Sequence, residues 1–174
     1  VSKIAAPITP PGGTRLAGRF VRVELMGKQV FLHLAEVQAF QGSDNIATRG
    51  KATQISTDYN GPPELAIDGN TNGAYEAKSV SHTAAAENPW WEVDLGSEQP
   101  LDRIVLWNRT DAGTENRLND YRVVLMNEKR EVVWEQASKE PVKPTAQVRG
   151  WRTRASPNAL ERPCNSANTP AGRP

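Results

Sequence analysis

The 174-residue sequence contains one cysteine and two histidines, and these small numbers exclude several kinds of site. A single cysteine, Cys164, cannot form a disulfide within the chain, so a disulfide-stapled scaffold is excluded. Two histidines and one cysteine are also too few for the usual zinc sites. The G-x-S-x-G motif of a hydrolase nucleophile is missing as well. We therefore expect a protein that is not an enzyme.

Long apolar runs and an excess of one charge are also missing. No apolar stretch reaches the roughly 20 residues of a membrane-spanning helix. The formal net charge is +1, whereas a nucleic-acid-binding surface usually shows a clear basic excess. The chain begins at Val1 without a charged and then apolar leader. We expect a soluble module, cut or processed from a longer protein, that neither inserts into a membrane nor binds nucleic acid.

Proline and glycine are concentrated at the two ends of the chain. Residues 1–18 have three prolines and a glycine pair, which is the composition of a linker. Residues 137–174 have six prolines, many basic residues and few aliphatic ones, which predicts a disordered tail. Residues 19–136 remain as the predicted folded domain, which is long enough to form one core.

Short apolar segments separated by turns fill residues 19–136. The segments 19–26 and 30–40 flank a Gly-Lys turn, which predicts a hairpin, and the segments 121–126 and 131–135 predict a second one. Further strands are expected at residues 90–95 and 101–107. The segment 101–107 is apolar on both faces and should be central in a sheet. About eight short strands without a long helical period predict an all-β fold, an antiparallel β-sandwich or jelly roll.

The loop D-G-N-T-N-G at residues 68–73 offers a carboxylate, side-chain amides and backbone carbonyls around glycine turns. Such hard oxygen ligands suit Ca²⁺. The loop is not an EF-hand, because the twelve-residue spacing and the closing glutamate are absent. The alternative is an Asx-turn that holds no ion.

His82, Arg109 and Arg117 form a second polar group, with Asp111 beside the arginines. A neutral imidazole and two guanidinium groups offer a fixed array of hydrogen-bond donors and acceptors. Sugar hydroxyls need such an array, because each hydroxyl both donates and accepts. The alternative is that Asp111 only pairs with an arginine to hold a loop.

Two other features have simpler interpretations. Trp90, Trp91, Trp107 and Trp134 could stack on a sugar ring, but their places in apolar strands favour core or rim packing. Asn108-Arg109-Thr110 spells an N-glycosylation acceptor. A glycan there would block the site that contains Arg109, so we interpret the match as a coincidence.

The spacing H-x26-R-x-D, from His82 through Arg109 to Asp111, resembles the sugar-binding signature of the F-type (fucose-binding) lectins. These lectins belong to the discoidin-like, coagulation factor 5/8 C-type galactose-binding-like class. The resemblance covers about residues 19–136. Further matching pieces are A-T-Q-I-S-T (52–57), A-I-D-G-N-T (66–71), S-H-T (81–83) and N-P-W-W-E-V-D-L (88–95).

The resemblance implies a discoidin-like β-sandwich that binds a carbohydrate with the help of Ca²⁺. The sugar ligands that it implies are His82, Arg109 and Arg117, with Asp111 beside them and Tyr75 near an aromatic position of the family. The calcium ligands that it implies are Asp68, Asn70, Ser79 and Glu36, with a backbone oxygen of Leu65. Two features differ from the family: five residues, not four, precede Arg117 after Asp111, and Ala112-Gly113 replace adjacent cysteines.

The order of the segments also differs from the family. The L-A-E-V segment at residues 34–37 lies near the start of this chain, whereas the family has its L-C-E-V strand last. We hypothesise a circularly permuted domain in which the segment 19–40 supplies the closing strands and Glu36 completes the calcium site. Such a domain requires this segment to pair with the strand at residues 121–126. The alternative is that residues 19–40 end a lost preceding repeat and lie apart.

The function implied by the resemblance is that of a calcium-dependent, lectin-like module for terminal fucose or a related sugar. Such a module would serve as an accessory or targeting domain, tethered to other domains of a longer secreted or surface protein. Its expected location is extracellular, on the cell surface or periplasmic. The rival hypothesis is a discoidin-like adhesion or scaffold domain that contacts protein partners without binding sugar.

Overall fold

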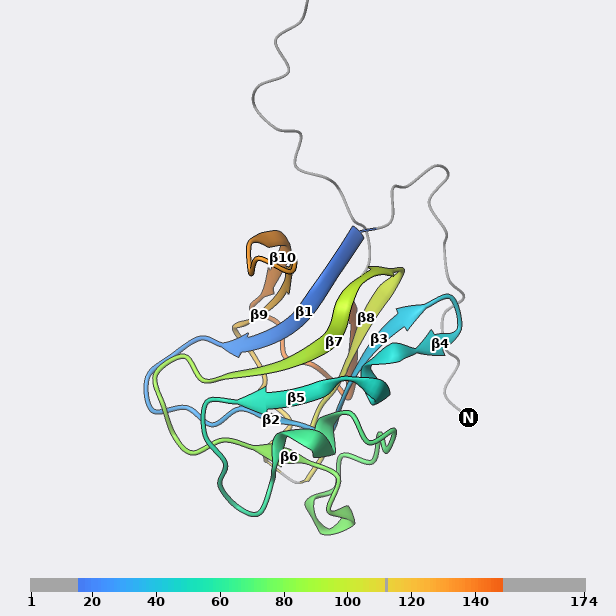
Figure 1. Cartoon of the computed structure of the whole chain (residues 1–174). Helices are drawn as coiled ribbons and strands as arrows, with labels where there is room; N and C mark the ends of the chain where they lie inside the picture. Colours follow the sequence, from blue (N-terminus) through green and yellow to red (C-terminus); the bar gives the residue numbers. More distant parts are fainter. Residues whose placement is uncertain (1–15, 112, 149–174) are drawn as a thin grey trace, which may run out of the picture.

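The computed structural model describes residues 16–111 and 113–148 (Figure 1). The strands are β1 (Leu16–Leu25), β2 (His33–Leu34), β3 (Glu36–Gln41), β4 (Asp44–Asn45), β5 (Lys51–Gln54), β6 (Ser81–His82), β7 (Trp90–Leu101), β8 (Arg103–Trp107), β9 (Tyr121–Met126), β10 (Val132–Ser138) and β11 (Thr145–Val148). Three short 3-10 helices are η1 (Ile46–Arg49), η2 (Pro63–Ala66) and η3 (Tyr75–Ala77). In this part of the chain, no helix is both long and apolar enough to cross a membrane.

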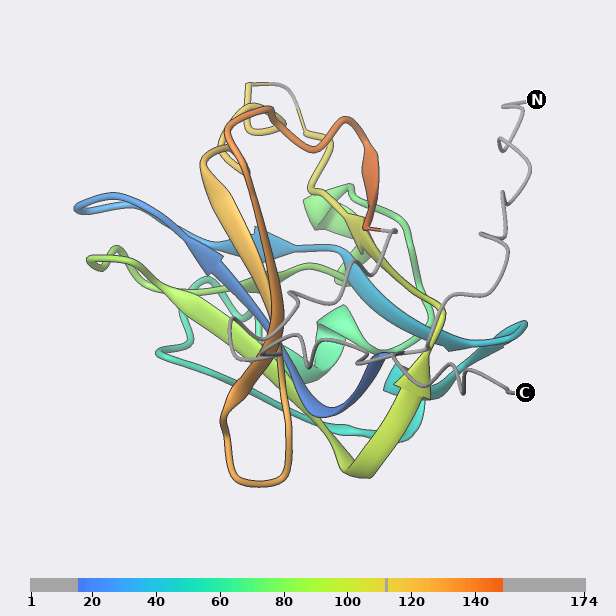
Figure 2. The same ribbon diagram turned by 90° about the horizontal axis from the view of Figure 1, so that it is seen from above.

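The strands form two main sheets and a short ribbon (Figures 1 and 2). One sheet has the order β10-β9-β1-β7-β5, the other has the order β11-β8-β3-β4, and β2 pairs with β6 in the ribbon. Every paired strand in these sheets runs antiparallel to its neighbour. The fold is therefore the predicted all-β antiparallel sandwich, and β8 has the predicted central position in its sheet.

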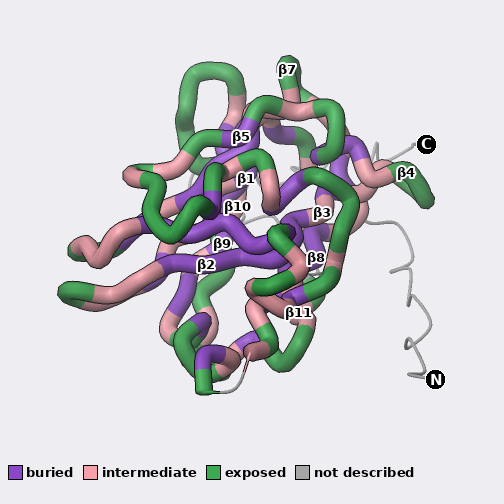
Figure 3. Tube along the Cα trace, turned by 90° about the horizontal axis from the view of Figure 1, so that it is seen from below, coloured by how far each residue is buried: buried purple, intermediate pink, exposed green. Residues whose placement is uncertain are grey.

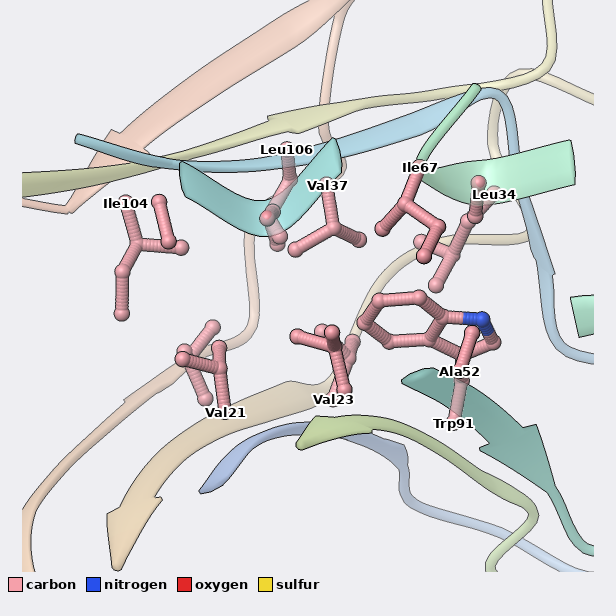
Figure 4. Close-up of a cluster of buried hydrophobic side chains, with 14 of the residues drawn as sticks. Val21, Val23, Leu34, Val37, Ala52, Ile67, Trp91, Ile104 and Leu106 are labelled. Carbon is pink, nitrogen blue, oxygen red and sulfur yellow. The ribbon is translucent and has the colours of Figure 1, made fainter. Parts of the chain in front are cut away.

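Alternation along the strands decides which side chains enter the core. Successive side chains of a strand point to opposite faces, so every second residue of β1, β7 and β9 faces the second sheet. The side chains that meet between the sheets include Val21, Val23 and Trp91 from one side and Val37, Ile104 and Leu106 from the other (Figure 4). The buried stretches of the trace gather in these central strands, and the loops remain exposed (Figure 3).

The outward-facing positions of the five-stranded sheet carry charge. Arg22 lies opposite Glu92 in the register of β1 and β7, and its Nε donates to Glu92 Oε2 at 2.8 Å. Glu24 lies opposite Arg122 of β9 and accepts from its Nε at 2.9 Å. A slip by one residue would bury these charges and expose the valines of β1, so the alternation fixes the register.

The predicted hairpin of residues 19–26 and 30–40 is wrong. β1 lies in the five-stranded sheet, whereas the second segment divides into β2, in the ribbon, and β3, in the four-stranded sheet. The second segment is apolar on both faces because both of its faces are covered along most of its length. Such a pattern carries no sign of the point at which the chain passes from one sheet to another. The other predicted hairpin is confirmed, since β9 pairs with β10.

The predicted start of the tail at residue 137 is also wrong. β10 continues to Ser138, and β11 adds an edge strand that pairs with β8. Val142 lies in the core at 1% exposure, so a single aliphatic residue anchors this connection. The start of β1 at Leu16 likewise places the last residues of the predicted linker in the sheet. The rest of the predicted linker, residues 1–15, and the rest of the predicted tail, residues 149–174, lie outside the described residues.

The first segment of the chain is an integral part of the sandwich. β1 lies between β9 and β7, and its residues Phe20 to Leu25 pair with Met126 to Tyr121. β3 pairs with β8 in the opposite sheet. The pairing that the permutation hypothesis requires is therefore present, and residues 19–40 do not lie apart.

Trp91 and Trp90 are neighbours on opposite faces of β7, and their replacement should have unequal effects. Trp91 is completely buried and donates from Nε1 to the carbonyl of Pro63 at 2.9 Å. Trp91→Ala should lower the free energy of unfolding by about 3–5 kcal/mol, because it leaves a large cavity. Trp90 is half-buried under the guanidinium of Arg22, so Trp90→Ala should cost only about 1 kcal/mol. Urea unfolding of both variants checks this, and equal losses would contradict the assignment of faces.

Candidate functional site

His82 lies in β6, and its backbone is held from both sides. Its Cα is paired with that of His33 across the ribbon. On the other side its N–H donates to the carbonyl of Gly61 at 2.8 Å, and its own carbonyl accepts from the N–H of Asp58 at 3.0 Å. A Cβ atom at Gly61 would lie 2.6 Å from the nitrogen of His82, so only glycine allows this approach. The loop 58–61 is thereby pressed against β6.

The imidazole of His82 is 3% exposed and has a defined tautomer. Its Nδ1 lies 2.8 Å from the carbonyl oxygen of Thr83. A carbonyl can only accept, so Nδ1 carries the proton and Nε2 remains an acceptor. Burial lowers the pKa of His82, and the charges of Arg109 and Arg117 lower it further, although the Thr83 carbonyl and Asp58 oppose them. The ring is therefore neutral at pH 7.

Arg109 follows β8 and is oriented by Asp111. Its Nε donates to Oδ2 of Asp111, and its guanidinium lies 4.6 Å from the centre of the Tyr75 ring. The N–H of Tyr75 donates to both carboxylate oxygens of Asp111, at 3.0 and 3.1 Å. Burial alone would raise the pKa of Asp111, but the hydrogen bonds from Arg109 and from the Tyr75 N–H outweigh it, and the pKa is lowered. Asp111 is thus a charged anchor for Arg109 at neutral pH.

Tyr75 and Arg117 occupy different positions relative to this group. The hydroxyl of Tyr75 donates to the carbonyl of Tyr59 at 2.6 Å and so ties η3 to the loop beside His82. Arg117 is exposed, and within the described parts of the chain its guanidinium has no hydrogen bond or ion pair. Its charge nevertheless lowers the pKa of His82. The structure thus joins His82, Arg109, Asp111 and Tyr75 in one site and leaves Arg117 within electrostatic reach of it.

The loop that begins at Asp68 is a series of Asx-turns. Oδ1 of Asp68 accepts from the N–H of Asn70 at 2.7 Å, and Oδ1 of Asn70 accepts from the N–H of Asn72 at 3.1 Å. The hydroxyl of Ser79 donates to the carbonyl of Asn72 at 2.5 Å and holds the end of the loop. Leu65 precedes the loop in η2, where its N–H donates to the carbonyl of Pro62.

Glu36 lies beside this loop although it is far away in the sequence. The residue is completely buried, and its Oε1 accepts from the N–H of Gly69 at 3.2 Å. Its Oε2 is buried and has no hydrogen-bond partner in the described part of the protein. Burial and, to a smaller extent, the nearby charge of Asp68 together raise the pKa of Glu36 to about 7, against the opposing hydrogen bond from the Gly69 N–H. A cation beside Oε2 would satisfy this oxygen and relieve the repulsion from Asp68.

The donor set beside Glu36 fits calcium better than a transition metal. In residues 16–111 and 113–148 no three His, Cys, Asp or Glu side chains gather closely enough to hold a metal ion by themselves. A cation here would therefore need amide, hydroxyl and backbone oxygens in addition to the two carboxylates. Ca²⁺ accepts six to eight oxygen ligands of these kinds.

Residues 65–156, more than half of the chain, match the F5/F8 type C family described as the NedA-like, galactose-binding domain. This chain belongs to that family. Fucolectin-1 of Anguilla japonica is 39% identical to this NedA-like domain over 90 residues, which are 48% of this chain and 49% of the lectin. The pentraxin fusion protein of Xenopus laevis is 32% identical over 93 residues, or 52% of this chain and 22% of that protein. This chain thus spans about half the length of the curated fucolectins that it matches.

The solved structures that resemble this domain include two lectin modules. The lectin domain of lectinolysin, complexed with the Lewis b antigen, is 38% identical with a TM-score of 0.59, over 61% of this chain and 76% of that one. The fucose-binding module SpX-3 of Streptococcus pneumoniae is 34% identical with a TM-score of 0.58, over 60% and 76%. These similarities agree with the predicted discoidin-like, F-type lectin class.

The structure agrees with the interpretation of the tryptophans and of the glycosylation motif in this NedA-like domain. Trp91 is in the core, and Trp107 donates to the side chain of Gln38. Asn108 is 1% exposed, and its Nδ2 donates to the carbonyls of Glu115 and Val142 at 2.7 and 2.8 Å. An amide engaged in this way is not available to a glycosylating enzyme.

Sequence reasoning missed three rings that surround His82. The centres of Phe31, His33 and Tyr59 lie 5.6, 5.5 and 4.7 Å from the centre of the His82 ring. Tyr59 carried one usable signal, because an aromatic residue in a polar Asp-Tyr-Asn-Gly turn is unusual. Phe31 and His33 carried none, because their positions depend on the pairing of β2 with β6.

Proposed function

We propose that this domain is a carbohydrate-binding module for terminal L-fucose or a related sugar. The observation that carries the proposal is the placement of a neutral imidazole beside a guanidinium that a carboxylate orients. Such a group can accept from one sugar hydroxyl and donate to another. The names of the similar proteins support the same ligand, since they include fucolectins and a fucose-binding module.

Each residue of the site has a distinct part in the proposed binding. Nε2 of His82 accepts a hydrogen bond from a ring hydroxyl, while Nδ1 stays bound to Thr83. Arg109 keeps its Nε on Asp111 and donates to the sugar from its terminal nitrogens. Arg117, which is exposed, approaches from the rim and adds further donors.

We also propose that the module binds Ca²⁺ at Glu36 and the Asp68 loop. The support is the buried Oε2 of Glu36, which has no hydrogen-bond partner among the described residues and lies next to a second carboxylate and a loop rich in amide oxygens. Bound calcium supplies positive charge that offsets the two carboxylates. Ser79 ends this loop and lies three residues before His82, so a stiffened loop lowers the ordering cost of sugar binding.

A single shallow site of this kind would bind a sugar weakly. We expect a Kd on the order of micromolar to millimolar, which corresponds to about −4 to −8 kcal/mol. Useful avidity requires several sites or a tether to another domain. We therefore propose that the module targets a longer secreted or surface protein to fucosylated glycans outside the cell.

Titration with L-fucose and a glycan array, each in calcium and in EDTA, test the proposal. The intact chain should bind fucosylated glycans in calcium and more weakly in EDTA. His82→Leu, which lacks the acceptor nitrogen but keeps an apolar side chain of similar size, should lose binding while the domain stays folded, with a Tm lowered only by the loss of the bond to Thr83. Absence of binding to any glycan would overturn the proposal and favour an adhesion domain that contacts proteins.

A further inference from the structure

The backbone and ring of His82 are restrained by more contacts than its own hydrogen bonds. Its N–H and carbonyl are bound to the loop 58–61, and its Nδ1 is bound to Thr83. Phe31 and His33 cover the ring from the segment that enters β2, and Tyr59 covers it from the loop. Residues 31 and 33 are two apart in an extended segment, so their side chains lie on the same face.

His33 is an unfavourable residue for a purely structural position. It is 1% exposed, and neither ring nitrogen has a hydrogen-bond partner among the described residues. Burial lowers its pKa to about 3, and His82, Arg109 and Arg117 contribute in the same direction, so the ring is neutral. A buried polar group without a partner destabilises the folded state, and an apolar residue would avoid that cost. Such departures from good packing chemistry are expected at functional sites.

We infer that Phe31 and His33 are positioning residues of the sugar site, which hold the His82 imidazole in the orientation that binds the ligand. The inference rests on the proposed function. The bond from Nδ1 to Thr83 fixes one atom of the ring, and the flanking rings limit its remaining rotation. The free-energy cost of ordering this side chain on binding is then lower. The segment that the resemblance identifies as displaced in the chain would thus complete the sugar site as well as the sheet.

Four variants of the full chain test the inference: Phe31→Leu, Phe31→Tyr, His33→Leu and, as a reference without the acceptor, His82→Leu. Each is titrated with L-fucose, melted, and studied by NMR of the ¹⁵N-labelled imidazole rings. Phe31→Leu and His33→Leu should each raise the Kd for fucose by about three- to tenfold. Phe31→Tyr keeps the ring and should stay within about twofold of wild type. In the two leucine variants at positions 31 and 33, the ¹⁵N signals of His82 should change from those of one tautomer to averaged values.

Stability separates a positioning role from plain packing. His33→Leu should melt at or above the temperature of wild type, whereas a clear loss of stability would show that His33 serves only the core. Wild-type affinity in Phe31→Leu and His33→Leu, or weaker binding with unchanged His82 signals, would overturn the inference. If wild type binds no fucose, the proposed function fails instead, and the His82 signals of the ligand-free variants still decide whether the rings position it.

Discussion

Replacing Arg109 with methionine is expected to remove measurable binding of L-fucose, with a Kd raised by about a hundredfold or more. The Arg109 side chain is 15% exposed, and its guanidinium is paired with Asp111 and packed over Tyr75, so it is already oriented before a ligand arrives. Each charge-assisted hydrogen bond contributes about 1.5–3 kcal/mol, and two such bonds to the sugar give the expected loss. Methionine keeps the apolar stem against Tyr75. Calorimetric titration measures the Kd, and the Tm shows whether the fold is intact.

Arg109→Lys and Asp111→Asn are the matched controls for this prediction. Lysine keeps the charge but concentrates its three donors on one nitrogen, so it cannot reproduce the spacing at which the planar guanidinium reaches both Asp111 and the sugar. Arg109→Lys should therefore bind nearly as weakly as the methionine variant. Asp111→Asn should bind with intermediate affinity, because the amide oxygen still accepts from the N–H of Tyr75. A methionine variant within tenfold of wild type would place the sugar away from Arg109.

The strands of the sandwich were predictable where one face is buried and the other is exposed to solvent. β9 follows the alternation of its sequence, and β10 pairs with it across a polar turn. The segment 30–40 was predicted as a strand, but its pairing partners were not predicted. Side chains buried on both faces do not indicate which sheet covers each face. Prediction also failed for β11, since its pairing with β8 and the burial of Val142 are long-range contacts that the local sequence does not encode.

The polar residues of the site were predictable, but their apolar surroundings were not. His82, Arg109 and Asp111 stand out because their residue types and spacing suit sugar hydroxyls. The contacts of Phe31 and His33 with His82 join residues about fifty positions apart through the ribbon. No local pattern encodes such a contact. The position of Arg117 shows the same limit, because the spacing alone cannot show that its side chain is exposed.

The place of Glu36 in β3, near the start of the chain, links the fold to the proposed cation site. Glu36 enters from β3, which pairs with β8, and β8 leads directly to Arg109. The same strand pair therefore positions the buried carboxylate beside the Asp68 loop and the guanidinium of the proposed sugar site. Loss of the cation should therefore change the affinity for sugar through this shared pair of strands.

Calcium is expected to raise the Tm of wild type, and Glu36→Gln is expected to abolish this rise. Calcium stabilises the folded state by mass action if it does not bind the unfolded chain. Glutamine has the same shape as glutamate and keeps an oxygen for the N–H of Gly69, but it lacks the charge that calcium requires. Melting curves in EDTA, in millimolar calcium and in millimolar magnesium measure the effect. Magnesium is the control, because it needs a smaller and more regular oxygen cage.

The same variant has a distinct pH dependence in EDTA. The folded-state pKa of Glu36, about 7, lies above its ordinary value of 4.5, so the folded state favours the protonated form. Without calcium, wild type therefore loses stability as the pH rises from 4.5 through 7, by about 3 kcal/mol in total. Glutamine does not ionise, so Glu36→Gln does not lose this stability. Its advantage over wild type in unfolding free energy should therefore be about 2–3 kcal/mol larger at pH 8 than at pH 5.

The difference in unfolding free energy between wild type and Glu36→Gln at each pH is free of the contribution of His33. That contribution changes stability with pH in the direction opposite to that of Glu36. The pKa of His33 is lowered from 6.5 to about 3 in the folded state. Below pH 6.5 the unfolded chain binds a proton at His33 that the folded protein does not, so both proteins lose the same amount of stability as the pH falls. Only Glu36 then separates the two unfolding curves. A constant offset between the proteins at pH 5 and pH 8 would show that Glu36 is not the buried charge. A calcium-induced rise in Tm of equal size in both would show that the cation binds elsewhere.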